Sequence, residues 1–188
     1  MAKSKVVLIV ILVVVAIVGV WLVSINNRLV TLREGCSAAG AQVETVLQRR
    51  FDLVPNLVET VKGYAKHEKG VIEEVTRLRS QWATAKTPED KAQAAAQLEG
   101  GISRLLLVAE QYPDLKASDG FLGLQVQLEG TENRIAVERQ RYNEAIRVYN
   151  TSIQTFPNSL VAALRSFTPV HSYYESAPQA KEAPKVKF

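Results

Sequence analysis

Two adjacent residues, His67 and Glu68, are the first whose types could do metal chemistry. A zinc protease of the H-E-x-x-H type needs a second histidine one turn further along the same helix, so that two imidazoles bind the ion. Position 71 is a valine, and the only other histidine is His171. The sequence therefore predicts no metal site, and we expect His67 to be a surface or hydrogen-bonding residue.

Cys36 is the single cysteine of the chain, so it cannot form an internal disulfide. It falls on the apolar face of a predicted helix, where a free cysteine behaves as a small buried hydrophobe. We expect a core residue, with a reactive thiol as the alternative.

The patterns of common catalytic sites are missing from the sequence. It contains no glycine-rich phosphate loop, nucleophile elbow or pair of carboxylates with orienting neighbours. Gly100-Gly101 is interpreted as a break in a helix. We therefore predict a protein that is not an enzyme, with no catalytic residues and no cofactor.

Glu68 occupies an otherwise apolar position in a predicted helix, where a carboxylate costs several kcal/mol unless it is paired. Arg134 and Arg141, on a later helix, are the candidate partners. A functional acid and an exposed position are the alternatives.

Further polar residues recur at helical spacing, and Asn143 and Asn150 are seven residues apart. Such side chains fix the register between helices, and a partner-binding surface is the alternative. Arg49 or Arg50 could also reach Asp52 or the start of the second helix. The candidate network or partner surface comprises Arg50, Asp52, Asn56, Glu68, Glu132, Asn133, Arg134, Asn143 and Asn150.

The chain that carries these residues begins with an apolar segment near the N-terminus. Residues 6–23 contain no polar side chain, and about 18 to 20 such residues in a helix cross a hydrocarbon core of about 30 Å. A cleaved signal peptide has a shorter apolar core and a small-x-small cleavage site, which the stretch around Ser24 lacks. We predict a transmembrane helix over residues 6–25 that binds the lipid bilayer, with Trp21 at the interface.

Lys3 and Lys5 precede this helix, whereas Arg28 and Arg33 follow it beside Glu34. The positive-inside rule then favours a cytoplasmic N-terminus. We expect a single-pass protein of the bacterial inner membrane with an extracytoplasmic domain.

The rest of the chain predicts helices, with apolar residues at alternating steps of three and four as in a coiled coil. We expect helices over about 24–50, 55–86, 88–111 and 118–156, with caps at Thr87 and Ser118, and a short helix over 157–166. Long helices joined by short turns predict an all-α antiparallel up-down bundle of about four helices. The expected parts are a segment over 1–5, the transmembrane helix over 6–25, the bundle over 26–168 and an extended or disordered tail over 169–188.

The net charge of +4 resides largely in lysines before the anchor and in the tail. A nucleic-acid-binding protein would show a basic face with interleaved aromatic residues. We therefore expect no nucleic-acid partner.

Three blocks of the sequence resemble the LemA family of bacterial membrane proteins. The longest is QRRFDLVPNLVETVKGYAKHE over residues 48–68; the others are GTENRI over 130–135 followed by Arg141-Tyr142-Asn143 and Tyr149-Asn150, and FPN over 156–158 with the closing PKVKF. One departure is Asn26-Asn27, where relatives often have Tyr-Asn. The resemblance implies a single-pass membrane protein with a helical-bundle domain.

An anchor, long helical faces and no catalytic set predict a non-enzymatic scaffold or adaptor of the bacterial envelope. Its bundle would bind other membrane or envelope proteins and could self-associate. The alternative is a homo-oligomeric protein that organises or shapes membranes, because some family members are linked to intracellular membrane compartments.

Overall fold

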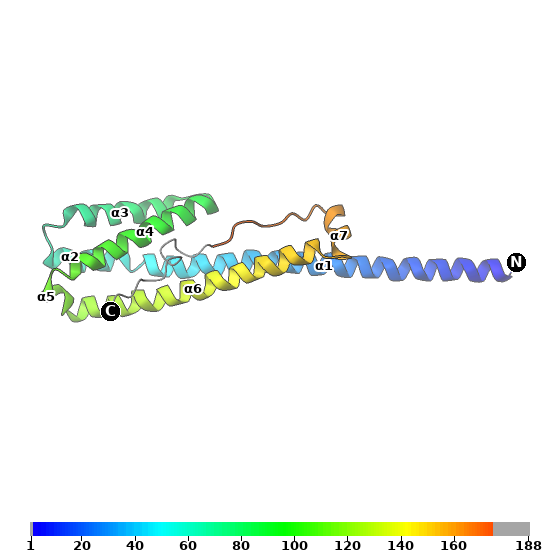
Figure 1. Cartoon of the computed structure of the whole chain (residues 1–188), viewed down its shortest axis with the longest axis horizontal. Coiled ribbons are helices and arrows are strands. Elements are labelled where there is room, and N and C mark those ends of the chain that lie inside the picture. The colour runs from blue at the N-terminus through cyan, green and yellow to red at the C-terminus, as the bar shows by residue number, and fades with distance from the viewer. Residues whose placement is uncertain (1, 175–188) are drawn as a thin grey trace, which may run out of the picture. The chain divides into compact units, whose positions relative to one another are not determined.

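The computed structural model describes residues 2–174, although not the side chains of 2–4, 88 and 89. These residues form helices and no strands, which confirms the all-α prediction. The helices are α1 (Ala2–Phe51), α2 (Val54–Tyr64), α3 (Lys69–Thr84), α4 (Pro88–Ala109), α5 (Pro113–Lys116), α6 (Asp119–Gln154) and α7 (Asn158–Leu164) (Figure 1).

Helix α1 has 50 residues and is therefore about 75 Å long. Its first half carries the apolar stretch, whose side chains from Val6 to Val23 are exposed. Among the described residues, this is the one helical segment long and apolar enough to cross a membrane. Burial in the core begins at Ile25 and Leu29, so the change from a lipid-compatible surface to a protein core takes place within one turn.

Helix α1 ends at Phe51 and α2 begins at Val54, as the Pro55 signal predicts. The expected cap at Thr87 is present, because its side chain accepts a hydrogen bond from the Asp90 N–H (3.0 Å). Ser118 accepts one from the Phe121 N–H (3.4 Å) at the start of α6. The turn chemistry of the sequence therefore fixes three of the helix starts.

The expected helix over 55–86 is wrong in one respect, because it is divided between Tyr64 and Lys69. Tyr64 is 48% exposed, whereas Ala65 is buried in its place. The break changes which residues face the core, and no proline marks it. Gly63 and Gly70, on either side of the break, lower the local helix propensity. Tertiary packing decides this boundary.

Gly100-Gly101 does not break a helix, contrary to the sequence interpretation, because α4 continues through both residues. A Cβ at Gly101 would lie 3.1 Å from Leu78 Cδ1 and 3.2 Å from Val75 Cγ2. The glycine thus permits the close approach of α4 to α3, which runs antiparallel to it (Figure 1). Packing compensates for the low helix propensity.

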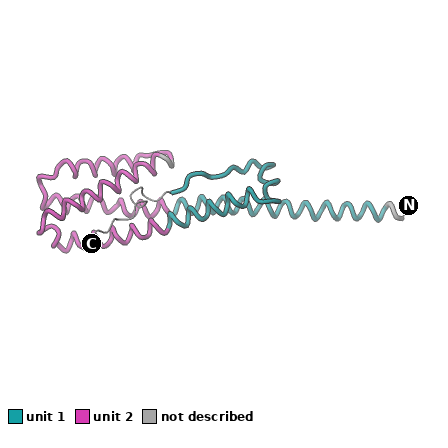
Figure 2. Tube along the Cα trace, viewed as in Figure 1, with its two compact units in different colours: residues 1–42, 138–188 teal, residues 43–137 magenta. Residues whose placement is uncertain are grey.

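The chain divides into two compact units (Figure 2). Unit 1 combines residues up to 42 with those from 138 onward. Its core contains side chains from α1, α6 and α7, with Phe167 and Val170 of the following extended segment packed against it. The buried members are Ile25, Leu29, Cys36, Ile146, Tyr149, Ile153, Val161 and Ala162.

Unit 2 comprises residues 43–137 and contains the end of α1, all of α2 to α5 and the first half of α6. Its fully buried side chains include Val43, Phe51, Leu57, Leu98 and Ile135. Phe51 packs edge-on against Trp82, with ring centroids 4.8 Å apart.

Residues 169–174, the first part of the predicted tail, are not helical. The remainder of that prediction, residues 175–188, lies outside the described residues.

Candidate functional site

Arg50 is the most buried charged residue described, with 7% of its surface exposed. It lies seven residues beyond the buried Val43, on the same face of α1. It is also in the last turn of that helix, where a cation interacts favourably with the negative end of the helix dipole. The helical repeat of the sequence therefore carries a guanidinium into the core of unit 2.

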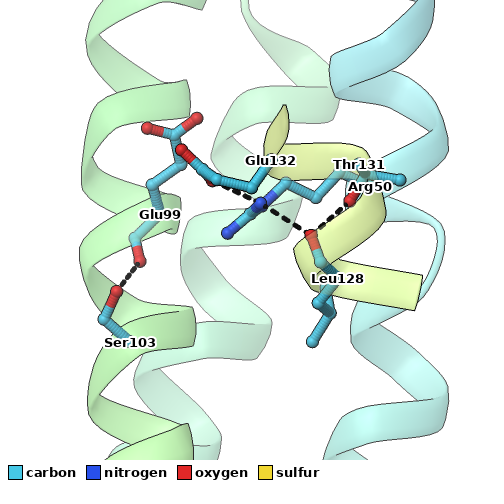
Figure 3. Close-up of polar contacts among 6 residues, drawn as sticks. All are labelled: Arg50, Glu99, Ser103, Leu128, Thr131 and Glu132. Atoms are coloured by element: carbon cyan, nitrogen blue, oxygen red, sulfur yellow. Dashed lines mark hydrogen bonds and ion pairs between the residues drawn. The ribbon is translucent and has the colours of Figure 1, made fainter. Parts of the chain in front are cut away.

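The guanidinium is held by α6 (Figure 3). Nη1 forms an ion pair with the half-exposed carboxylate of Glu132 and donates to the Leu128 carbonyl (3.2 Å). The buried Thr131 hydroxyl donates to the same carbonyl (2.8 Å). Nε of Arg50 has no hydrogen-bond partner among the described residues, so the charge is only partly compensated.

A cavity of about 330 Å³, here called the Arg50 cavity, adjoins this guanidinium. Two of the predicted site residues, Glu132 and Asn133, line it together with Arg50. The other lining residues are Leu106, Glu110, Phe121, Gln125, Leu128 and Glu129. The structure thus brings Arg50 together with two residues that lie about eighty positions later in the sequence.

Asp52 does not pair with Arg49 or Arg50, contrary to expectation. Its Oδ1 accepts a hydrogen bond from Gln48 Nε2 (2.7 Å) and lies 3.9 Å from Arg79 Nη2. Arg79 Nε also donates to the Phe51 carbonyl at the end of α1 (3.3 Å). Arg79 therefore links α3 to the C-terminus of α1. Asp52 does not reach Arg50, because the α1 backbone directs Arg50 inward and leaves Asp52 exposed.

Glu68 lies in the break between α2 and α3 and is partly buried. Its partner is neither Arg134 nor Arg141: the Tyr112 hydroxyl donates to Glu68 Oε1 (3.3 Å), while Arg141 pairs with Glu138 (2.8 Å). Desolvation by burial raises the pKa of the Tyr112 phenol, and the Glu68 charge and hydrogen bond raise it further. The phenol therefore stays protonated as a donor.

Asn143 and Asn150 of α6 bind the extended segment that follows α7. Asn143 donates to the Tyr174 carbonyl (2.8 Å) and accepts from the Tyr174 N–H (2.9 Å). Asn150 makes the same pair of bonds to Val170 (2.7 and 2.9 Å). The predicted helix-to-helix register contact is therefore replaced by two amide clamps that fix a backbone with no helical hydrogen bonds of its own.

The remaining candidate residues of the predicted network do not lie together in one site. Asn56 and Arg134 are exposed, and so is His67. No group of three or more His, Cys, Asp or Glu side chains that could hold a metal ion occurs in the described part of the chain. Cys36 is buried, and desolvation raises the pKa of its thiol.

A second hollow, here called the α2–α3 groove, has a volume of about 1130 Å³. Its floor contains the buried side chains of Val54, Val58 and Ile72. The charged residues along it are five cations and two carboxylates: Lys62, Lys66, Lys69, Arg77, Arg79, Glu59 and Glu73. An apolar floor with a mainly cationic rim is suited to an acidic amphipathic helix.

The profile described as the LemA family matches residues 39–188. The chain belongs to the LemA family. The match extends from the second half of α1 to the end of the chain, and so includes most of unit 1 outside the apolar stretch and all of unit 2.

Curated relatives of this LemA-family chain share about a quarter of its residues. Magnetosome protein MamQ of Magnetospirillum gryphiswaldense is 26% identical over 79% of this chain and 64% of its own length. Magnetosome protein MamQ 2 of Paramagnetospirillum magneticum is 27% identical over 81% and 65%, and Protein LemA of Metamycoplasma hominis is 24% identical over 73% and 63%. The chain thus spans less than two thirds of the relatives' length. Family membership and the apolar helix together indicate a membrane-associated protein.

The LemA block over residues 48–68 contains the end of α1, the turn into α2 and the break before α3. It therefore supplies Arg50, Asp52 and Glu68, but not their partners. Sequence reasoning missed Thr131 and Tyr112 as members of these contacts. Thr131 stands beside Glu132 in the second block, which was a usable signal, whereas nothing in the sequence connects Tyr112 with Glu68.

Proposed function

We propose that this protein is a membrane-anchored, non-enzymatic scaffold or adaptor of the bacterial envelope that binds other membrane or envelope proteins. The observation that carries the proposal is the α2–α3 groove, which offers a concave surface on a chain held by an apolar N-terminal helix. The proposed partner segment is an acidic amphipathic helix.

Charge complementarity supports this partner chemistry. Lys62 pairs with Glu59 (3.2 Å), and Arg79 is engaged with Phe51 and Asp52. Lys66, Lys69 and Arg77 have no ionic partner among the described residues. They would meet acidic side chains, while apolar residues at spacings of three and four would contact the floor.

The test is photocrosslinking of the full-length protein in native membranes. A p-benzoylphenylalanine at Thr76, in the groove, is compared with one at the exposed Ser103 of α4. We expect a discrete crosslinked species from position 76 only, with an acidic helical segment identified by mass spectrometry. Lys66→Glu with Lys69→Glu abolishes it, whereas Arg134→Glu on the exposed surface of α6 does not. Equal crosslinking from both positions, or insensitivity to the groove charges, refutes the proposal.

The second candidate is a homo-oligomer that organises or shapes membranes. The relatives named as magnetosome proteins favour it, since they associate this sequence family with a particular cellular structure. Size-exclusion chromatography with light scattering on detergent-solubilised full-length protein separates the two. A small defined species supports the adaptor, and a large ring or sheet supports the membrane-organising assembly.

The proposed location is the inner membrane with the helical units on the extracytoplasmic side. Labelling of intact spheroplasts tests this with a membrane-impermeant maleimide. A cysteine at the exposed Ser103 is labelled in intact spheroplasts under this topology, and only after lysis under the opposite one.

A further inference from the structure

We propose that α7 is an interfacial helix whose outer face inserts into the headgroup region of the same bilayer that holds α1. The proposal rests on the membrane span proposed above. It adds a second lipid contact, made by a segment more than a hundred residues away in the sequence from the anchor.

Helix α7 is apolar on two opposite faces. Val161 and Ala162 are buried in the core of unit 1. On the outer side, Phe156, Leu160 and Leu164 are 75%, 58% and 80% exposed. These three residues, here called the α7 outer row, follow one another at intervals of four residues, so that Leu160 and Leu164 share one face of the helix. A row of large, mainly exposed apolar side chains indicates an apolar environment outside the chain.

The position of α7 identifies that environment. Leu164 and Arg165 form a small hollow with Leu22, Val23 and Asn26 of α1. Arg165 Nε donates to Asn26 Oδ1 (3.2 Å). Leu22 and Val23 are the last residues of the apolar stretch, so α7 lies where α1 would leave the hydrocarbon core. Leu164, the last residue of the α7 outer row, therefore lies next to the end of the apolar surface of α1.

Polar groups suited to the headgroup layer occur at the same level. Arg165 is exposed beside the α7 outer row, Arg28 is exposed one turn past Ile25, and Trp21 is 48% exposed just before it. Tryptophan and arginine favour the membrane–water interface, where the aromatic ring meets acyl chains and the cation meets phosphate. A lipid surface would bury the α7 outer row among acyl chains and place the flanking arginines at the phosphates, as in helices that lie in the interface plane.

The test measures bilayer depth in the full-length protein reconstituted in phosphatidylcholine–phosphatidylglycerol nanodiscs. Single cysteines carry the fluorophore bimane at Val13 in the anchor, at Leu164 in α7 and at Leu107, a 66% exposed leucine of α4, all in a Cys36→Ala background. Lipids bearing a nitroxide quencher either near the headgroup or near the acyl-chain end report the depth. Circular dichroism confirms that each variant keeps its helices.

We expect the headgroup-proximal quencher to remove about half of the emission at position 164, since interfacial helices bury their apolar face about 5–10 Å deep. The deep quencher should act most strongly at position 13, and the label at 107 gives the background. Quenching at 13 with none above background at 164 overturns the inference and leaves the anchor intact. No quenching at 13 overturns the anchor itself, and the inference with it.

Discussion

The Arg50–Glu132 ion pair predicts which of two substitutions, Glu132→Ala or Arg50→Met, lowers the free energy of unfolding more. Glu132→Ala removes the carboxylate and leaves a buried guanidinium with the Leu128 carbonyl as its remaining hydrogen-bond acceptor among the described residues. Arg50→Met removes the buried charge but keeps an apolar side chain of similar length. We expect the loss of the half-exposed glutamate to be more harmful than the loss of the buried arginine.

The magnitudes follow from burial. Removing one partner of a fully buried pair costs about 3–5 kcal/mol. Solvent at Glu132, whose side chain is 51% exposed, reduces this to about 2 kcal/mol. Arg50→Met loses a charged hydrogen bond worth about 1.5–3 kcal/mol, but relieves about 1–3 kcal/mol of desolvation at a guanidinium whose Nε is unsatisfied. The net cost of Arg50→Met is therefore about 1 kcal/mol or less.

Urea denaturation of the full-length protein in detergent micelles measures these differences. In a Trp21→Phe background, fluorescence comes from Trp82, which packs on Phe51 next to the substituted arginine. The double variant should recover about 1 kcal/mol relative to Glu132→Ala, because it no longer contains an isolated buried cation. Glu129→Ala, another exposed carboxylate on the Arg50 cavity, serves as the control and should change stability by less than about 0.5 kcal/mol.

The reasoning is refuted if Arg50→Met destabilises the protein as much as Glu132→Ala, or if the double variant is no more stable than Glu132→Ala. Either result would mean that the contacts of the guanidinium outweigh its desolvation cost by well over about 1 kcal/mol.

Three further predictions concern other contacts. Gly100→Ala should stabilise α4 by about 0.5–1 kcal/mol, because a Cβ there meets nothing within 4 Å. Gly101→Ala should not stabilise it, because its Cβ meets α3 side chains at 3.1 and 3.2 Å. Thermal melting followed by circular dichroism compares the two variants. Asn150→Asp should cost about 1–3 kcal/mol by losing its donor to the Val170 carbonyl, and should accelerate proteolysis within residues 168–174. Tyr112→Phe should reduce the loss of folding stability that the wild-type protein shows at high pH. The pKa of the Tyr112 phenol in the folded protein is raised above its ordinary value of 10.0. The phenol's contribution to the free energy of unfolding is therefore complete below about pH 10 and disappears as the pH rises through the folded pKa.

Each of these has a contrary outcome. Equal gains from the two alanines would mean that α3 yields freely to a Cβ. Unchanged proteolysis in the Asn150 variant, relative to the exposed Asn133→Asp, would show that the amide clamp does not hold the segment. A wild-type protein that loses no more stability than Tyr112→Phe between pH 9 and 11 would contradict the direction of the Tyr112 pKa shift.

The sequence predicts those parts of the fold that local physics controls. The apolar stretch, the Pro55 signal, the Thr87 cap and the faces that bury Leu29 and Leu98 are all visible without coordinates, because each depends on neighbours within one or two turns. The family resemblance rests on the same local blocks. The membership it indicates is confirmed by the match over residues 39–188.

Contacts between distant segments could not be predicted in this way. Glu68 finds Tyr112 instead of an arginine because the break after Tyr64 turns it toward the start of α5. Asn143 and Asn150 repeat at seven residues, which suggests a helical partner, yet the backbone they bind is extended. Periodicity shows which side of a helix carries a group, but not what lies opposite.

In the sequence, unit 2 is inserted between the two parts of unit 1, and this has a consequence for the order in which the chain folds during its synthesis. Residues 43–137 contain every helix segment that unit 2 requires. Its core can therefore form as soon as residue 137 has emerged, since domains generally fold as units from the N-terminal side. Unit 1 must wait longer, because Ile25 and Leu29 are covered by α6 and α7 residues made more than a hundred positions later. During that interval, the apolar side chains of α1 around Ile25 and Leu29 are not yet covered by α6 and α7. Early membrane insertion of the preceding apolar stretch would hold the nascent chain at the membrane until α7 has been synthesised.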